Sequence, residues 1–298
     1  MRFFLTTDYS MEGVRDMDNY RVVEGWPVLP AGYELGVVSD MAVDSWDRVY
    51  VIDREPHNHI LIFDRSGTFL AMWGDDFLVT PHGIMIGPDD RVYITDRGSH
   101  TVWICTTDGT LLQTIGTPGK IGAPDQPFNN PTNSALAPWG DLYVSDGYGQ
   151  SRVHRFAPDG TLIAAWGSEG SGLGQFHLPH DVRVDSRGRV FVADRENSRL
   201  QLFDRDGAFL EEWTDVARPQ NILIGRDNLL YVTEVPQRIS IFNLDGELLA
   251  RWGEKGDGPG QFRDSPHGLA VDSRGDLYIA EVTGRARFQK FERVVSSR

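Results

Sequence analysis

The chain has 298 residues, of which 40% are hydrophobic and 11% aromatic, a composition typical of globular rather than disordered proteins. Its 43 acidic residues outnumber 29 basic residues, and the net charge of −14 argues against binding to nucleic acid or to anionic membranes. Thirty-two glycines and 16 prolines, spread along the chain, indicate many turns and few long helices and predict an all-β fold.

Residues 1–19 show no periodicity and are interpreted as an N-terminal arm. The apolar patch at residues 3–5 is too short for the core of a signal peptide, and no stretch has the apolar length of a membrane span. Cys105 is the single cysteine, which excludes an intramolecular disulfide and fits a reducing compartment. We therefore expect a cytoplasmic monomer.

Six similar units follow between residues 37 and 291. Each has two β runs joined by a polar turn, a third run, a turn often containing Asp-Gly, and a fourth run ending in Trp-Gly. An acidic residue ends the second run and recurs every 40 to 50 residues, at Asp53, Asp96, Asp146, Asp194, Glu234 and Glu281. This spacing is typical of four-stranded blades and predicts a six-bladed β-propeller.

The sixth unit ends after its third run, at residues 288–291, and has no Trp-Gly strand. Residues 20–26 resemble that missing strand. We expect them to close the ring by supplying the outer strand of the last blade, which removes an open sheet edge. Residues 1–298 would then form a single domain.

The first strand of each propeller blade lies innermost, so equivalent residues at its start surround one axis. We align six residues at this position, with histidine in blades two, four and six: Asp40, His82, Thr132, His180, Gln220 and His267. Three alternating imidazoles would converge on the axis and leave one coordination position open, as in catalytic zinc sites. The alternative is that each Pro-His pair merely enters a strand and bonds the backbone.

The residues that follow the second strand form another ring near the same mouth. It contains Arg54, Arg97 and Arg195, with Tyr148 beside them. Arginine suits bidentate capture of a carboxylate, so we expect a small anionic substrate. The alternatives are that each arginine pairs with a nearby acid and that Tyr148 is a packed aromatic residue.

Several stretches together resemble peptidyl-α-hydroxyglycine α-amidating lyase, a six-bladed propeller of NHL repeats. They are Pro81-His82-Gly83, residues 144–148, Trp166-Gly167, residues 174–176, residues 192–197 and Pro266-His267. The likeness extends from about residue 37 to residue 291. Among these stretches, Ser-Asp-Gly-Tyr and Ala-Asp-Arg-Glu-Asn are the most specific to the lyases.

The resemblance implies a zinc ion held by His82, His180 and His267. It also implies that Tyr148 accepts a proton and that Arg54 and Arg195 face the substrate carboxylate. The reaction of the family splits an N-acyl-α-hydroxyglycine into an amide and glyoxylate.

Some residues depart from the family pattern. Animal members of the family carry cysteines at three positions that resemble those of Gly149, Phe191 and Leu202 in this chain. The replacement of these cysteines fits a cytoplasmic relative. Gly268 replaces a carboxylate that binds structural calcium in the family, and Asp181 from another blade is the alternative ligand.

Ser265 occupies a position that belongs to the substrate pocket in the family, and Arg97 adds a cation to that pocket. The substrate is therefore expected to be smaller, more polar or more anionic. Two other functions stay open: a zinc-dependent hydrolase or hydratase that uses the same histidines, and a metal-free propeller that binds a protein partner.

Overall fold

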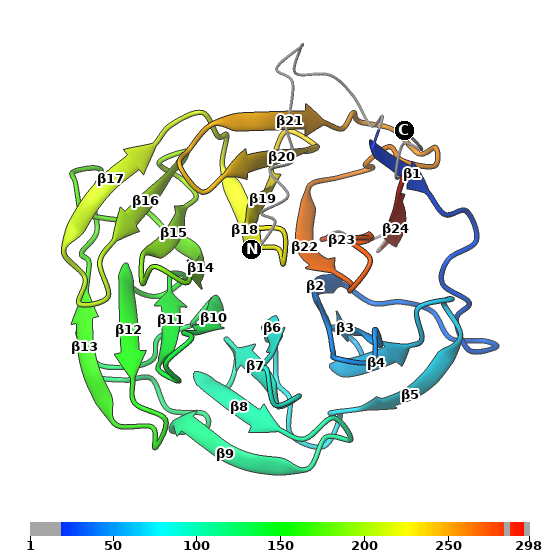
Figure 1. Cartoon of the computed structure of the whole chain (residues 1–298). Helices are drawn as coiled ribbons and strands as arrows, with labels where there is room; N and C mark the ends of the chain where they lie inside the picture. Colours follow the sequence, from blue (N-terminus) through cyan, green and yellow to red (C-terminus); the bar gives the residue numbers. More distant parts are fainter. Residues whose placement is uncertain (1–18, 283–286, 295–298) are drawn as a thin grey trace, which may run out of the picture.

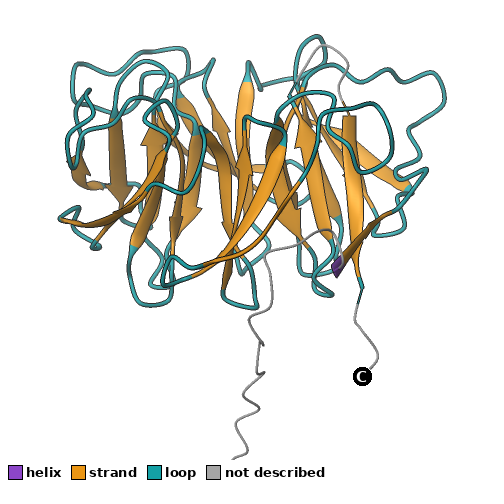
Figure 2. Cartoon of the chain, turned by 90° about the horizontal axis from the view of Figure 1, so that it is seen from above, coloured by secondary structure: helices purple, strands orange, loops and turns teal. Residues whose placement is uncertain are grey.

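The computed structural model describes residues 19–282 and 287–294. Its strands form six four-stranded antiparallel sheets arranged as blades around a central axis (Figure 1). Viewed from the side, the strands run between two faces of a disc, and loops cover both faces (Figure 2). The predicted all-β six-bladed propeller is confirmed, whereas residues 1–18 of the predicted N-terminal arm lie outside the described residues.

Each blade consists of four strands, in order from the axis outward. Blade one has β2 (Val38–Val43), β3 (Val49–Asp53), β4 (His59–Phe63) and β5 (Phe69–Trp73); blade two has β6 (Pro81–Ile86), β7 (Val92–Asp96), β8 (Thr101–Cys105) and β9 (Leu111–Gly116); blade three has β10 (Asn133–Leu136), β11 (Leu142–Asp146), β12 (Arg152–Phe156) and β13 (Leu162–Trp166).

Blade four has β14 (Pro179–Val184), β15 (Val190–Asp194), β16 (Arg199–Phe203) and β17 (Phe209–Trp213); blade five has β18 (Pro219–Ile224), β19 (Leu229–Glu234), β20 (Arg238–Asn243) and β21 (Leu248–Trp252); blade six has β22 (Pro266–Val271), β23 (Leu277–Glu281), β24 (Arg287–Arg293) and β1 (Tyr20–Val22). The second strand of every blade is buried along nearly its whole length, because both of its faces pack against neighbouring blades.

Recurring Trp-Gly contacts hold neighbouring blades together. Gly109 has a φ of +87°, and a Cβ atom there would lie only 2.7 Å from the indole of Trp73, which ends the outer strand of the preceding blade. Glycine is needed because no other residue leaves room for the indole. The same contact joins Trp166 to Gly207, Trp213 to Gly246 and Trp26 to Gly67.

The N-terminal strand closes the ring, as predicted. β1 pairs antiparallel with β24, and Tyr20 lies opposite Arg293. Trp26 follows this strand and packs against Tyr278 and Phe288 of blade six and against Phe63 of blade one. Segments from both ends of the chain therefore build the last blade.

The strand register corrects the alignment of blade one. In blade four Val182 pairs with Val192, two residues before Asp194, and in blade one Met41 pairs with Val51, two residues before Asp53. Ser39, rather than Asp40, is thus the equivalent of His180. In the other five blades a proline immediately precedes the aligned residue, whereas in blade one Val38 precedes Ser39. Because this proline is missing, the sequence pattern places the equivalent residue one position too late, at Asp40.

Candidate metal centre

Three histidines converge at the channel axis. His82, His180 and His267 are the second residues of β6, β14 and β22, and their exposed fractions are 2%, 1% and 4%. Their ring centroids lie 4.9 to 5.0 Å apart, and one ligand nitrogen from each lies within 4.8 Å of the others. The alternating positions therefore bring three buried imidazoles together.

The Nδ1 atom of each histidine bonds a backbone carbonyl of the next blade along the chain. His82 bonds Thr132 at 2.7 Å, His180 bonds Gln220 at 2.5 Å and His267 bonds Ser39 at 2.6 Å. Because a carbonyl only accepts, Nδ1 carries the proton and Nε2 keeps its lone pair. Ser39, Thr132 and Gln220 hold the corresponding positions of their own blades, so alternate blades supply the imidazole and the carbonyl that orients it.

The imidazoles are held in their neutral form. Burial, followed by the charges of neighbouring groups, lowers the pKa of His267 to about 3 and that of His82 and His180 well below the ordinary value. Neutral imidazole is the form that binds a metal ion. Three inward nitrogens, each oriented by a second hydrogen bond, fit a zinc ion with one further position open.

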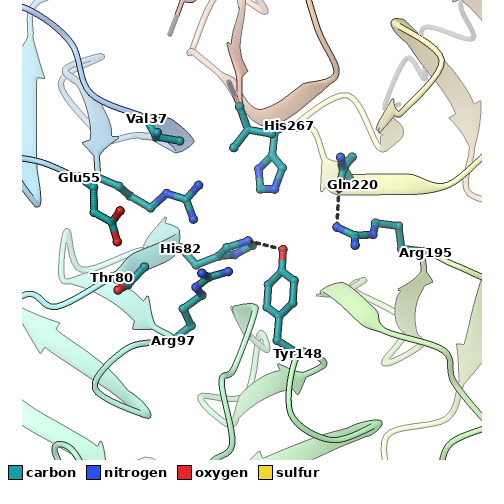
Figure 3. Close-up of a pocket in the computed structure, with 11 residues that line it drawn as sticks. Val37, Glu55, Thr80, His82, Arg97, Tyr148, Arg195, Gln220 and His267 are labelled. Atoms are coloured by element: carbon teal, nitrogen blue, oxygen red, sulfur yellow. Dashed lines mark hydrogen bonds between the residues drawn. The ribbon is translucent and has the colours of Figure 1, made fainter. Parts of the chain in front are cut away.

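Tyr148 lies directly beside these nitrogens. Its hydroxyl is 3.2 Å from Nε2 of His82 (Figure 3) and 3.1 Å from Nε2 of His180. Gly147 brings the phenol to this place, because a Cβ atom there would lie 2.2 Å from the carbonyl of Pro179. The hydroxyl is therefore within hydrogen-bond distance of two of the three candidate ligand nitrogens.

Three arginines surround the mouth of a cavity of about 180 Å³ above the histidines. The backbone N–H groups of Arg54, Arg97 and Arg195 bond the carbonyls of Val37, Thr80 and Leu178, which immediately precede the first strands of their own blades. This shared contact places the three side chains at equivalent heights. The guanidinium carbons of Arg97 and Arg195 lie 5.0 Å and 5.8 Å from the Tyr148 ring centroid, on the two sides of the ring (Figure 3).

Arg195 has partners within the protein. It contacts the Glu196 carboxylate at 2.9 Å and the side-chain oxygen of Gln220 at 3.2 Å. Ser265 does not line the pocket, contrary to expectation; it is buried behind Gln220, whose side-chain nitrogen donates to its hydroxyl at 3.2 Å. Gln220 thus orients His180 through its backbone and Arg195 through its side chain. The repeat pattern predicts that Gln220 lies beside the histidines, but it does not predict the contact between the Gln220 side chain and Arg195.

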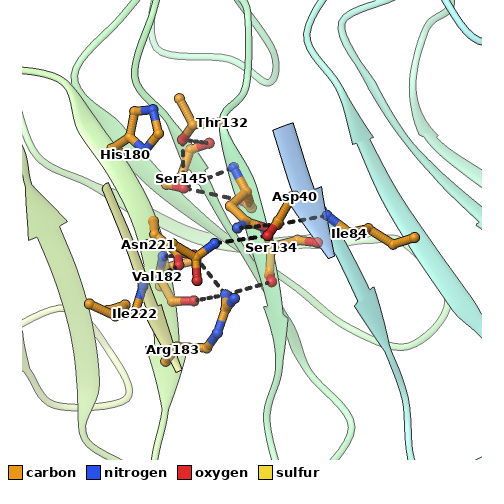
Figure 4. A network of polar contacts seen from close by, with 12 residues as sticks. Asp40, Ile84, Thr132, Ser134, Ser145, His180, Val182, Arg183, Asn221 and Ile222 are labelled. Atoms are coloured by element: carbon orange, nitrogen blue, oxygen red, sulfur yellow. Dashed lines mark hydrogen bonds and ion pairs between the residues drawn. The ribbon is translucent and has the colours of Figure 1, made fainter. Parts of the chain in front are cut away.

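A second polar ring lies one residue deeper along the axis (Figure 4). The two oxygens of Asp40 accept four N–H groups, from Met41, Ile84, Asn133 and Asn221. Burial raises the pKa of Asp40 to about 7, and the nearby Asp181 carboxylate adds to the effect. Asp40 therefore already has a full set of hydrogen-bond donors.

Asp181 is likewise occupied. It accepts the backbone N–H groups of Val182 and Ile222 and contacts Arg183 at 2.6 Å. Calcium needs carboxylate and carbonyl oxygens that are free to coordinate it. The residues of this ring do not fit the calcium site that the lyase resemblance suggested, because protein donors and one guanidinium already satisfy their oxygens.

Comparison with known proteins places the chain in a family. Residues 78–105, 176–203 and 264–291 match the model of the NHL repeat. The chain is 34% identical to the human NHL repeat-containing protein 3 over 297 residues, covering 91% of this chain and 84% of that protein. The chain belongs to the NHL-repeat propeller family.

This NHL-repeat protein is also 32% identical to peptidyl-alpha-hydroxyglycine alpha-amidating lyase 1 of Drosophila melanogaster over 195 residues. That match covers 58% of this chain and 35% of the lyase. Among solved structures, that of a streptogramin B lyase has a TM-score of 0.68 and covers 93% of this chain and 98% of that one, at 15% identity. The latter likeness shows a common fold only.

Of the expected resemblance, membership of the NHL-repeat propellers is confirmed, and amidating lyases are more distant relatives. No helix in residues 19–282 and 287–294 has the length and apolar character needed to cross a membrane.

Proposed function

We propose that this NHL-repeat protein is a metal-dependent lyase that cleaves the C–N bond of an N-acyl-α-hydroxyglycine, or of a similar carbinolamide, to an amide and glyoxylate. The observation that carries the proposal is the position of the Tyr148 hydroxyl, 3.2 Å and 3.1 Å from the Nε2 atoms of two histidines whose Nδ1 atoms are fixed by carbonyls. A phenolic hydroxyl thus stands next to a buried set of neutral nitrogen ligands.

The residues suit the proton movements of this reaction. Zinc bound by His82, His180 and His267 would polarise the substrate hydroxyl and favour loss of its proton. Tyr148 would be the acceptor of that proton; a carbon–oxygen double bond forms while the carbon–nitrogen bond breaks. The departing amide nitrogen then takes the proton back from Tyr148, so that no proton is gained or lost overall.

The arginines would handle charge. Arg97 and Arg195 lie on the two sides of the Tyr148 ring, where their charges stabilise negative charge on its oxygen. Arg54 and Arg195 both line the cavity and can receive the substrate carboxylate. Because Gln220 and Glu196 fix the Arg195 guanidinium, it is pre-organised for this contact.

The first test is the metal content of the purified protein. We expect about one zinc ion per chain in the wild type and in His177→Ala, whose side chain is exposed, but not in His180→Ala. The zinc-loaded protein should release glyoxylate from N-benzoyl-α-hydroxyglycine. A protein that purifies without metal and rejects added zinc would contradict the proposal and leave the metal-free binding propeller.

A hydrolase or hydratase that uses the same three histidines is distinguished by its products. Reaction in ¹⁸O-labelled water introduces solvent oxygen into the product of a hydrolase or hydratase. The lyase releases an amide that keeps its original acyl oxygen, whereas hydrolysis of the acyl–nitrogen bond gives the free acid with one solvent oxygen in its carboxylate. Labelled acid in place of unlabelled amide, detected by mass spectrometry, would replace the lyase proposal with hydrolysis.

A further inference from the structure

Two of the three arginines at the mouth have no acidic partner among the described residues. Arg54 and Arg97 follow β3 and β7 in neighbouring blades, and both side chains are partly buried in the cavity wall. Within residues 19–282 and 287–294, neither guanidinium has a carboxylate oxygen within 4.0 Å. Burial lowers the pKa of Arg54, and the charge of Arg97 is the next largest cause, which places the two cations close to each other.

Three other arginines of the described residues, buried or partly buried, are paired with carboxylates. Arg155 contacts Asp141 at 2.6 Å, Arg199 contacts Asp194 at 2.8 Å and Arg287 contacts Glu281 at 2.6 Å. At the cavity, Arg195 has Glu196 at 2.9 Å. Positive charge is therefore partly compensated on the blade-four side of the mouth and uncompensated on the side of blades one and two.

An uncompensated pair of like charges in a partly buried wall is unfavourable unless an anion joins it. Glu55 also lines the cavity, but its side chain is exposed and its carboxylate is more than 4.0 Å from both guanidiniums. The Glu55 charge acts on Arg54 in the direction opposite to burial, but an exposed carboxylate that makes no direct contact is screened by solvent. Among the described residues, Arg54 and Arg97 therefore have no carboxylate partner, and an anion bound in the cavity can supply one.

The α-hydroxyglycine carboxylate assigned to Arg54 and Arg195 leaves Arg97, on the other side of Tyr148 from Arg195, without an anion (Figure 3). We propose that the substrate carries a second anionic group, a carboxylate on its acyl portion, which binds at Arg97. This inference rests on the proposed lyase and names its substrate class: short N-acyl-α-hydroxyglycines whose acyl group ends in an acid.

The test uses analogues that cannot be cleaved, so that binding is measured apart from catalysis. N-succinylglycine and N-succinamoylglycine lack the α-hydroxyl and differ only by a terminal carboxylate in place of an amide. With the zinc-loaded wild type, calorimetry should give about tenfold or greater preference for the acid, as expected when a buried cation gains a charged hydrogen-bond partner. In Arg97→Gln the ratio of the two affinities should fall to about one.

Arg187→Gln is the control, because it removes one charge from an arginine whose side chain is 60% exposed and pairs with Asp245 outside the cavity. It should keep the wild-type preference. Equal affinities in the wild type, or a preference that survives in Arg97→Gln, would overturn the inference.

The hydroxylated forms of the same two compounds then test the reaction through glyoxylate release. Absence of glyoxylate together with an intact acid preference would refute the lyase and not the anion site. Release of glyoxylate without a preference for the acid would refute the anion site and not the lyase.

Discussion

Nδ1 of His267 donates a hydrogen bond to the backbone carbonyl of Ser39, 2.6 Å away, although 228 positions separate the two residues in the sequence. This bond connects blade six to blade one across the point where the ring closes. One of the three candidate metal ligands is therefore oriented only when the closure is intact. Stability of the closure and affinity for the metal should change together.

Trp26→Ala tests this coupling. The indole packs against Phe63, Tyr278 and Phe288 and its nitrogen has no hydrogen-bond partner among the described residues, so its loss is one of packing. We expect the free energy of unfolding to fall by about 3–5 kcal/mol. We also expect weaker zinc binding, measured by competition with a fluorescent chelator.

Trp46→Ala is the matched control, because that side chain is 65% exposed and should lose less than about 1 kcal/mol. Zinc affinity that stays at the wild-type value in a clearly destabilised Trp26→Ala protein would show that the metal ligands do not depend on ring closure.

Zinc affinity should depend only weakly on pH. An imidazole with the ordinary pKa of 6.5 is mostly protonated at pH 5.5, which would cost about tenfold in affinity for each ligand and about a thousandfold for three. In this protein the pKa values of all three histidines are lowered, that of His267 to about 3, so protons compete with the metal only as the pH approaches these folded-state values. We expect less than about a tenfold loss between pH 7.5 and 5.5 by chelator competition.

A thousandfold loss over that range would mean that the folded protein holds the imidazoles with ordinary pKa values. The unfolded chain has no such shift, so these histidines also make the metal-free protein less stable as the pH falls below 6.5, where only the unfolded state takes up their protons.

The repeats made the fold predictable, because each blade has the same pattern of strands, turns and packing residues. Trp73 and Gly109 illustrate this: a tryptophan ends one outer strand and a glycine in the next hairpin makes room for it, and both residues recur at fixed places. The histidine ring followed from the same equivalence. The alignment is wrong in blade one, where it gives Asp40 in place of Ser39. Val38 precedes Ser39 there, whereas a proline precedes the equivalent residue in the other blades.

Contacts between non-equivalent residues could not be predicted in this way. The bond from Gln220 to Ser265 joins neighbouring blades through side chains that no other blade repeats, and Ser265 was consequently expected in the pocket itself. The saturation of Asp181 by Arg183 was also invisible, because it depends on where a long side chain folds back within its own strand. The period of the repeat predicts which positions are equivalent, but side-chain packing determines which residues contact one another.

Removing the Tyr148 hydroxyl should separate catalysis from metal binding. Tyr148→Phe keeps the ring between Arg97 and Arg195 but loses the proton acceptor, so kcat for glyoxylate release should fall by about 10²–10⁴ with bound zinc unchanged. Tyr93→Phe, which changes a buried phenol that is not among the residues lining the cavity, should retain activity. Full activity in Tyr148→Phe would exclude the hydroxyl as the proton acceptor.

The polar ring below the histidines should be independent of calcium. Arg183 contacts Asp181 at 2.6 Å and also bonds the backbone carbonyls of Ser134 and Val182, so a guanidinium already binds the carboxylate and carbonyl oxygens that a calcium ion would need. A calcium-selective chelator should therefore leave the thermal midpoint unchanged. Arg183→Met should lower the free energy of unfolding by about 3–5 kcal/mol, because the buried Asp181 carboxyl loses its charged hydrogen-bond partner. Arg187→Met, at an exposed ion pair, should cost at most about 1 kcal/mol. A midpoint that falls on chelation and recovers with calcium would show that the ring rearranges to bind the ion after all.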